Sequence, residues 1–448
     1  MGPEVQKVVG RLSGVTAAAD ELARMPSSDP AFLARVGKAY TMVGAHDRAA
    51  DFFARAVKAA PMDADLHYSL GAALVFRGDF QGAKTHLTRA VELEPRHFPA
   101  WYSLVVLEKQ TPTSNHISHL GALFAGPDPI GHRKLHMGHA MAKTFEDLGD
   151  YPRAFEWLLK AKADRARKAS YSAAGEAALF AAAREAAGAG KGTGFGSEEP
   201  VFIVGMPRTG TTLLESILGA HPDVTAAGEL GIFPVLVKVM AGGGDGPLLD
   251  ATYFAAMADA DLGRLGRAYV EATRPVSGRT ARFIDKTPIN ILYAGLILRA
   301  LPNARVICLR REPMDSVISY FRHMFFAWPH VYPSIYDLEN AARHYVEFHR
   351  LADHWAQTLP ADRYLEQGYE ALVEDQEGQT RRMLAFLGLP FDERSLKFHE
   401  QEQVVSTASA VQVRQPLYAS AVGRWRRYGP QLQPAVDILR EAAIPVEG

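Results

Sequence analysis

The sequence has almost no cysteine and no excess of either charge. Cys308 is the only cysteine among 448 residues, which excludes an internal disulfide framework and a thiolate zinc site. The 49 basic residues balance 50 acidic ones, so no global electrostatic field attracts nucleic acid or an anionic membrane. Any binding site for an anion must therefore be local.

Long apolar runs are also missing. Glu4, Lys7 and Arg11 interrupt the N-terminal stretch, which therefore lacks the apolar centre of a secretory signal peptide. No uninterrupted apolar run reaches membrane-spanning length. We expect a protein of the cytoplasm, whose reducing environment fits a single thiol. The length and the 48% hydrophobic content suffice for two cores.

An internal period of 34 residues marks the first third of the chain. Its spacing and its alternation of small and large residues are typical of tetratricopeptide repeats, in which paired helices pack through small side chains. We expect an all-α solenoid over residues 1–187, with a capping helix near 172–187, followed by a glycine-rich linker over 188–199. The two in-phase copies are Leu33, Gly37, Tyr40, Gly44, Ala49, Phe53, Ala56 and Pro61, then His67, Gly71, Leu74, Gly78, Ala83, Leu87, Ala90 and Pro95.

Beyond the linker, short apolar runs alternate with helical stretches. The runs at 201–204, 282–285 and 305–309 have the length and composition of buried parallel strands. Residues 200–448 are therefore expected to form an α/β domain with a P-loop-like, doubly wound parallel sheet.

The strongest local signal is the run VGMPRTGTTLLE at 204–215, a glycine-bounded loop between a strand and a helix. Its spacing matches a Walker A motif, but Thr211 stands where that motif has its lysine. Arg208 supplies a cation from inside the loop instead. ATP and GTP sites use the lysine and Mg²⁺ to neutralise a triphosphate. A phosphosulfate could be held without a metal by the loop amides, Thr209, Thr211, Thr212 and one arginine.

This loop, together with His221-Pro222, Glu229, Lys286 and the segment 311–319, makes residues 200–428 resemble the sulfotransferase superfamily. The resemblance is to bacterial tetratricopeptide-repeat sulfotransferases, which look like relatives of tyrosylprotein sulfotransferases. It implies 3′-phosphoadenosine-5′-phosphosulfate (PAPS) as the sulfonate donor, 3′,5′-adenosine diphosphate (PAP) as its product, and no required metal. The implied reaction is in-line transfer of a sulfonate group to an acceptor hydroxyl.

The resemblance also implies residue roles. Arg311 and Ser319, eight residues apart, would bind the 3′-phosphate, and only this spacing favours Arg311 over the adjacent Arg310. Weaker assignments place Tyr369 near the adenine. The full set of implied donor-binding residues is Arg208, Thr209, Gly210, Thr211, Thr212, Arg311, Ser319, Tyr369, Ser409 and Arg424.

Catalysis is assigned to Glu229, Lys286 and Arg208. A carboxylate at Glu229 could deprotonate the acceptor if burial raises its pKa toward the working pH. The alternative is a glutamate favoured by the dipole at a helix start. Lys286 and Arg208 would stabilise charge on the transferring group, although Lys286 could instead form a structural ion pair with Asp285.

The acceptor stays open among a peptide tyrosine, a saccharide and a small molecule, because Gly231 stands where secretory tyrosylprotein enzymes carry an arginine that reads acidic peptides. The repeats are expected to bind a peptide or protein, with no role for nucleic acid, and a homodimer stays open. His132, His136 and His139 are expected to be packed or solvated rather than metal ligands. Two alternatives remain: a P-loop kinase or NTPase, and a repeat scaffold that binds nucleotide without catalysis.

Overall fold

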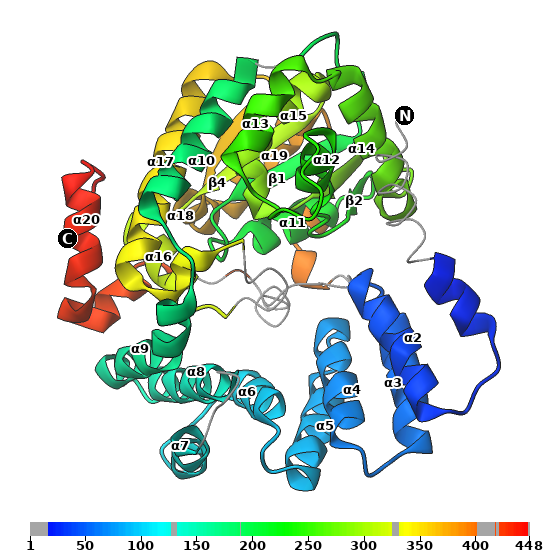
Figure 1. The fold of residues 1–448 in the computed structure, drawn as a ribbon, viewed down its shortest axis with the longest axis vertical. Helices are drawn as coiled ribbons and strands as arrows, with labels where there is room; N and C mark the ends of the chain where they lie inside the picture. The colour runs from blue at the N-terminus through cyan, green and yellow to red at the C-terminus, as the bar shows by residue number, and fades with distance from the viewer. Residues whose placement is uncertain are drawn as a thin grey trace.

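The computed structural model describes residues 17–126, 132–188, 190–324, 331–400, 417 and 421–446. A curved row of helices from the N-terminal part lies beneath an α/β unit (Figure 1). The helices of this row are α2 (Pro30–Met42), α3 (His46–Ala59), α4 (Ala64–Arg77), α5 (Phe80–Leu93), α6 (Phe98–Leu107), α7 (Ile117–Ala125), α8 (His132–Asp147) and α9 (Tyr151–Lys168).

Close packing through glycine explains the 34-residue period. A Cβ added at Gly37 would lie 2.8 Å from the Phe53 ring, and one at Gly71 would lie 2.9 Å from Leu87 Cγ. Gly138 repeats the arrangement against Ala161 in the α8–α9 pair. Each pair can therefore approach closely only because one helix lacks a side chain at the crossing. The predicted helical-repeat architecture is confirmed.

The sheet has five parallel strands in the order β2-β3-β1-β4-β5. The three strands expected from the sequence are present, and two further ones complete the sheet. This arrangement confirms the α/β doubly wound fold class. The strands are β1 (Pro200–Gly205), β2 (Val224–Ala226), β3 (Arg282–Asp285), β4 (Arg305–Arg310) and β5 (Tyr364–Gly368).

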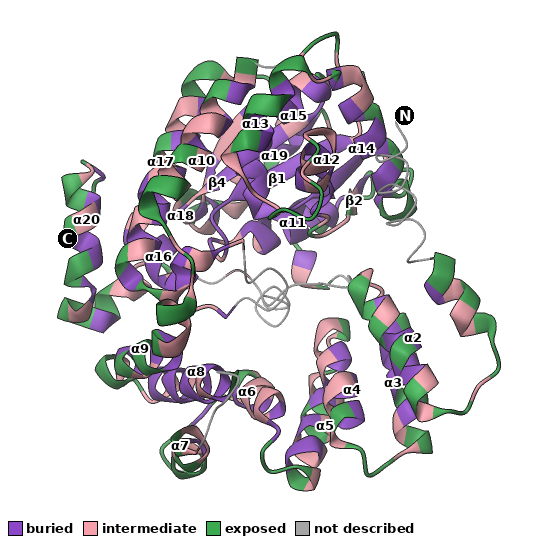
Figure 2. Cartoon of the chain, viewed as in Figure 1, coloured by how far each residue is buried: buried purple, intermediate pink, exposed green. Residues whose placement is uncertain are grey.

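Both faces of the sheet are covered, as the continuous apolar strands require. Along β1, Val201 and Ile203 pack with the core beneath α11 and α19, whereas Phe202 and Val204 belong to the core on the other face. Figure 2 shows β1 buried along its whole length. The helices of this unit are α11 (Thr211–Gly219), α12 (Ile232–Met240), α13 (Ala251–Ala256), α14 (Leu262–Ser277), α15 (Ala294–Ala300), α16 (Pro313–Phe321), α17 (Leu338–Thr358), α18 (Tyr369–Glu374), α19 (Gln376–Leu387) and α20 (Gln433–Glu441).

The segment between the repeats and the sheet is held by the α/β unit. Helix α10 (Ala173–Glu185) packs against α17 and α13, and its Phe180 ring meets His344 edge-on. After α10, the amides of Lys191 and Phe195 donate to the carbonyl oxygens of Ala260 and Ala300 at 2.8 and 2.7 Å. One apolar core runs from α8 and α9 into the sheet, so the two halves of the chain share packing.

A buried lysine crosses from the repeats into the α/β unit. Lys162 on α9 donates to the carbonyl oxygens of His323 and Ile335 at 3.1 and 3.0 Å. Burial lowers the pKa of Lys162 to about 7. None of the described helices combines the length and apolar character needed to cross a membrane.

Candidate active site

The glycine-bounded loop lies between β1 and α11, where the strand order reverses between β1 and β4. This switch point is where doubly wound sheets bind ligands. Gly210 has φ 114° and caps α11, and a Cβ there would lie 2.8 Å from the Tyr369 ring. At Gly205 (φ 152°) a Cβ would lie 2.9 Å from the Leu309 carbonyl oxygen. The loop thus needs both glycines, because their backbone angles and their close neighbours leave no room for a side chain.

Arg208 has left-handed backbone geometry, with φ 69°, which non-glycine residues seldom adopt. The neighbouring Thr209 hydroxyl donates to the Met206 carbonyl oxygen at 2.7 Å and stabilises the turn. Burial raises the pKa of Tyr102 on α6, and Arg208 is the foremost charge opposing that rise. Burial lowers the pKa of His323, and the charge of Arg208 lowers it further. The loop arginine therefore lies near both a repeat helix and the end of α16.

Thr211 and Thr212 begin α11 and are buried.

Glu229 and Lys286 meet because they follow adjacent parallel strands, β2 and β3. The Lys286 amide donates to the Gly228 carbonyl oxygen at 2.8 Å, which continues the strand pairing to the end of the sheet. Lys286 Nζ then lies 2.6 Å from Glu229 Oε1. The Lys286 side chain is fully buried, whereas that of Glu229 is 41% exposed.

The carboxylate of Asp285 is bound by other groups, and Lys286 pairs with Glu229. Its oxygens accept from the Tyr269 hydroxyl at 2.9 Å, the Thr287 hydroxyl at 2.6 Å and the Asn290 amide at 3.2 Å. The Glu229 charge contributes to the raised pKa of Tyr332, which is caused mainly by burial. Glu229 is thus a half-exposed carboxylate held by a buried ammonium group.

Arg311 and Tyr369 come together at the end of β4, beside the loop. The Arg311 guanidinium lies 4.6 Å from the centroid of the Tyr369 ring. It also donates to the Ala421 carbonyl oxygen and lies 3.4 Å from Asp315. The buried Arg311 Nε has no hydrogen-bond partner among the described residues. The structure therefore brings together three residues predicted from the sequence: Gly210, Arg311 and Tyr369.

Arg310 is directed elsewhere. Its guanidinium bonds Asp353 at 3.0 Å, Glu366 at 2.7 Å and His349 at 2.8 Å. These contacts satisfy Arg310 within α17 and β5, which supports choosing Arg311 as the ligand-binding residue. Ser319 is half-buried on α16, about two turns beyond the start of that helix. Ser409 lies outside the described residues.

Asp315 ties the C-terminal segment to this corner of the site. Its fully buried carboxylate accepts from the Gly423 amide at 2.7 Å and the Trp425 amide at 2.9 Å. Asp315 was not among the site residues predicted from the sequence, although it lies inside the 311–319 segment. An acid in the first turn of a helix gave a weak signal for such a role.

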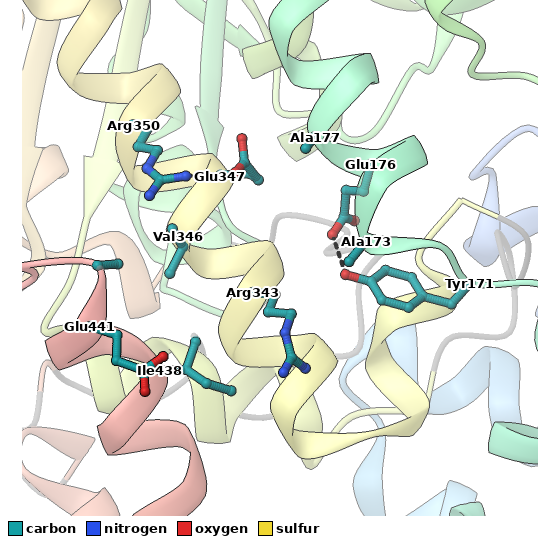
Figure 3. Close-up of a pocket in the computed structure, with 11 residues that line it drawn as sticks. Tyr171, Ala173, Glu176, Ala177, Arg343, Val346, Glu347, Arg350, Ile438 and Glu441 are labelled. Atoms are coloured by element: carbon teal, nitrogen blue, oxygen red, sulfur yellow. Dashed lines mark hydrogen bonds and ion pairs between the residues drawn. The ribbon is translucent and has the colours of Figure 1, made fainter.

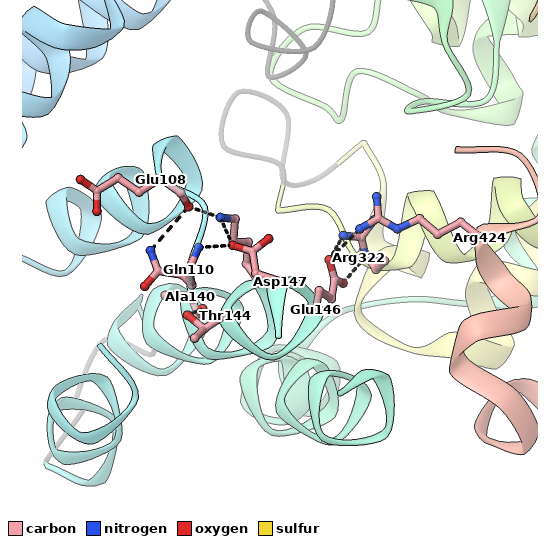
Figure 4. A network of polar contacts seen from close by, with 9 residues as sticks. Glu108, Gln110, Ala140, Thr144, Glu146, Asp147, Arg322 and Arg424 are labelled. Carbon is pink, nitrogen blue, oxygen red and sulfur yellow. Dashed lines mark hydrogen bonds and ion pairs between the residues drawn. The ribbon is translucent and has the colours of Figure 1, made fainter. Parts of the chain in front are cut away.

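Arg424 is paired with a carboxylate of the repeats (Figure 4). Glu146 on α8 accepts from Arg424 Nη2 at 2.9 Å, from the Arg322 guanidinium and from the Tyr428 hydroxyl. The pKa of Glu146 is lowered by both arginines against the opposing effect of burial. Arg424 Nε is buried without a described hydrogen-bond partner. Glu146 is thus a shared counter-ion between the two halves of the chain, which no sequence pattern indicated.

Replacing Glu146 by glutamine should destabilise the folded protein, because two half-buried arginines would lose the buried negative charge that they share. Breaking a buried pair in this way typically costs about 3–5 kcal/mol of unfolding free energy. Glu156→Gln is the matched control, since Glu156 is exposed and lies 3.8 Å from Lys160. Denaturant unfolding of both variants checks the prediction. Equal unfolding free energies for the two variants would contradict it.

The histidines of α8 and the hollow beside α10 form no part of the loop. His136 and His139 are buried in α8, and the described residues contain no group of three or more His, Cys, Asp and Glu arranged to hold a metal ion. A hollow of about 350 Å³ between α10, α17 and α20 is lined by Tyr171, Glu176 and Arg343, among others (Figure 3). None of the predicted site residues lines this hollow.

Two family models match the chain. Residues 200–393 match the sulfotransferase family, and residues 40–107 match the tetratricopeptide repeat. The chain carries a sulfotransferase domain preceded by tetratricopeptide repeats. The predicted resemblance is therefore confirmed, and the loop, Glu229, Lys286, Arg311 and Tyr369 all lie within the matched sulfotransferase range.

Curated relatives extend the likeness. An uncharacterized protein of Aquifex aeolicus is 31% identical over 409 residues, covering 89% of this chain and 53% of its own length. Protein-tyrosine sulfotransferase 1 of Danio rerio is 26% identical over 261 residues, covering 54% of this chain and 69% of its own. The chain thus spans about half the length of the Aquifex protein. The solved sulfotransferase domain of the Synechococcus PCC 7002 olefin synthase is 20% identical, with a TM-score of 0.40, and the match covers 58% of this chain and 99% of that one.

Proposed function

We propose that this protein is a PAPS-dependent sulfotransferase that moves a sulfonate group to an acceptor hydroxyl. The observation that carries the proposal is the loop of the sulfotransferase domain, which has Arg208 inside it and Thr211 in place of the Walker lysine. The Glu229–Lys286 pair follows strands of the same sheet, and Lys286 Nζ lies 2.6 Å from Glu229 Oε1. Such a set can bind an anion, neutralise developing charge and accept a proton.

The residues fit the sulfonate donor. Gly205 and Gly210 leave both ends of the loop without a side chain, and the start of α11 presents amides and a positive dipole end to the 5′-phosphosulfate. The buried Nε of Arg311 lacks a described partner, which suits a 3′-phosphate. We assign the 5′ side to Arg208, Thr209, Gly210, Thr211 and Thr212, the 3′-phosphate to Arg311 and Ser319, the adenine to Tyr369, and further contacts to Ser409 and Arg424.

The mechanism we propose uses the chain's own groups as follows. Glu229 takes the proton from the acceptor hydroxyl as its oxygen attacks sulfur in line. Lys286 holds the carboxylate through one of its three N–H donors, which leaves the others for the group in transfer. Arg208 neutralises the negative charge of the 5′-phosphosulfate at the loop. PAPS supplies the sulfonate group and departs as PAP when the sulfur–oxygen bond to its phosphate breaks.

We further propose that residues 1–187 recruit the acceptor, that 188–199 join the halves, and that 200–448 perform the transfer. Support for recruitment near the chemistry comes from Tyr102 on the repeat helix α6: burial raises its pKa, and the charge of Arg208 opposes that rise. A peptide tyrosine is the acceptor we favour, since one relative is named a protein-tyrosine sulfotransferase. A saccharide or small phenol is the alternative.

Nucleotide titration tests the proposal against its rivals. PAP should bind in the absence of Mg²⁺, because the loop has no Walker lysine and the donor has no triphosphate. Calorimetry with PAP and EDTA is compared with ATP and Mg²⁺. Binding of ATP only with Mg²⁺, and no binding of PAP, would support a kinase or NTPase instead.

Arg311→Ala should weaken PAP far more than 5′-AMP, because only PAP has the phosphate assigned to Arg311. Loss of charge-assisted hydrogen bonds predicts about 1.5–3 kcal/mol weaker PAP binding. Arg310→Ala is the comparison variant, since Arg310 is bound by Asp353 and Glu366. It should lower stability without discriminating between the nucleotides. Equal losses of PAP and 5′-AMP in Arg311→Ala would refute the assignment.

A further inference from the structure

Glu215 is a buried carboxyl group behind the proposed base. It lies on α11 at the end of the run 204–215, and its side chain is almost wholly inaccessible, with 6% of the residue exposed. Its neighbours Leu214 and Ile217 belong to the apolar core. A glutamate in such a place is costly unless its oxygens are bonded. Glu215 Oε1 accepts the amide hydrogen of Gly228 at 2.8 Å.

The Gly228 peptide connects Glu215 to the proposed catalytic pair. Its N–H is bound by Glu215, and its carbonyl oxygen accepts from the Lys286 amide at 2.8 Å. Gly228 has φ 76°, and a Cβ there would meet no atom within 4 Å, so backbone conformation rather than crowding requires glycine. The next residue is Glu229. A displacement of this peptide would therefore move Glu229 relative to Lys286.

The connection from β2 to α12 is also bonded to the β3 side. The Ala227 amide donates to the Ile284 carbonyl oxygen at 3.0 Å, and the Gly231 amide donates to the Thr287 hydroxyl at 3.1 Å. Both lie on the side of the connection that faces β3. Glu215 binds the connection from α11, so it completes the support of the turn that presents Glu229.

Glu215 also shares the charge of Lys286. Burial raises the pKa of Glu215 to about 7, helped by the negative charges of Glu229 and Asp285, while Lys286 and the Gly228 amide oppose the rise. Glu215 is thus within electrostatic reach of Lys286, Glu229 and Asp285. Because Glu215 gains and loses its proton near neutral pH, the negative charge behind the Glu229–Lys286 pair changes over the same range.

We propose that Glu215 is a positioning residue for sulfonate transfer, which sets the geometry of the Glu229–Lys286 pair through the Gly228 peptide. The inference rests on the proposed function. Glu215 touches neither acceptor nor donor in this account. Its contribution is to fix the turn and to tune the charge around Lys286.

Two variants separate the roles of the hydrogen bond and the charge. Glu215→Gln keeps an oxygen that can accept from Gly228 but cannot ionise. It should retain PAP affinity, while the inflection near pH 7 in the dependence of kcat on pH disappears. Glu215→Leu removes the acceptor and should lower kcat about 100-fold at unchanged PAP affinity, as expected for a misplaced catalytic group. Glu271→Gln, at an exposed position on α14, is the control.

A stability measurement makes the test independent of turnover. A carboxyl group whose pKa is raised on folding binds its proton more tightly in the folded state. Wild-type stability relative to Glu215→Gln should therefore fall as pH rises from about 4.5 to 7 and be constant above that range. For the kinetic comparison of these variants, kcat is measured as the rate of PAP release from PAPS in the presence of a tyrosine peptide.

An active wild type whose kcat–pH profile is unchanged by Glu215→Gln, and whose kcat is unchanged by Glu215→Leu, would overturn the inference. So would a stability difference that does not vary with pH, even if Glu215→Leu failed to fold. A wild type that releases no PAP with any hydroxyl acceptor would instead contradict the proposed function.

Discussion

Glu229→Gln is expected to lower kcat by roughly a hundredfold to ten-thousandfold while PAP affinity stays nearly unchanged, the usual effect of removing a positioned general base. The amide keeps the size of the side chain and can still accept a hydrogen bond from Lys286 Nζ, which lies 2.6 Å from Glu229 Oε1. It cannot accept a proton at neutral pH. Steady-state kinetics and PAP titration measure the two effects separately.

Glu271→Gln serves as the control for Glu229→Gln, because it changes the same groups at an exposed site remote from the loop. It should leave both kcat and PAP affinity unaltered. If Glu229→Gln lost PAP binding but kept its maximal rate, Glu229 would be a structural residue before α12. Another group would then have to take the proton.

Arg208→Ala should reduce both PAP affinity and turnover. The same guanidinium is assigned to the 5′-phosphate in the bound state and to the sulfonate in the transition state. Removing a preorganised donor of this kind typically costs about 10²–10³ in kcat. Alanine retains the Cβ, so the left-handed backbone at φ 69° is no less strained than in the wild type.

Arg208→Lys distinguishes charge from geometry. It keeps a positive charge but loses the planar, two-donor form of the guanidinium, so it should recover part of the affinity and little of the rate. Kd for PAP and kcat are measured for both variants. Loss of kcat without any loss of affinity would restrict Arg208 to the transition state, and unchanged values of both would remove it from the site.

The sequence predicted those features that depend on local patterns. The repeat period follows from Gly37 and Gly71, where a Cβ would meet Phe53 and Leu87. The loop and its helix follow from the glycines and the apolar run of β1. Arg311 was chosen over Arg310 by spacing alone, and the contacts of Arg310 with Asp353 now support that choice.

Other features depend on pairing across long sequence separations. Glu229 and Lys286 are 57 residues apart, and they meet because the three-residue strand β2 pairs with β3. That strand was too short to predict. Glu146 and Arg424 are 278 residues apart, on elements with no shared pattern. Glu215 did leave a signal, since a charged residue interrupts the apolar face of α11, but only the fold shows that it binds the Gly228 amide.

The most direct test of the account is transfer of labelled sulfonate from PAPS by the purified protein without added metal. Acceptors are a tyrosine peptide, its phenylalanine counterpart, a saccharide and a small phenol, with Glu229→Gln as the inactive comparison. The account predicts label on a hydroxyl acceptor and stoichiometric PAP, both greatly reduced in Glu229→Gln. PAP binding without transfer to any of these acceptors, or equal transfer by wild type and Glu229→Gln, would contradict it.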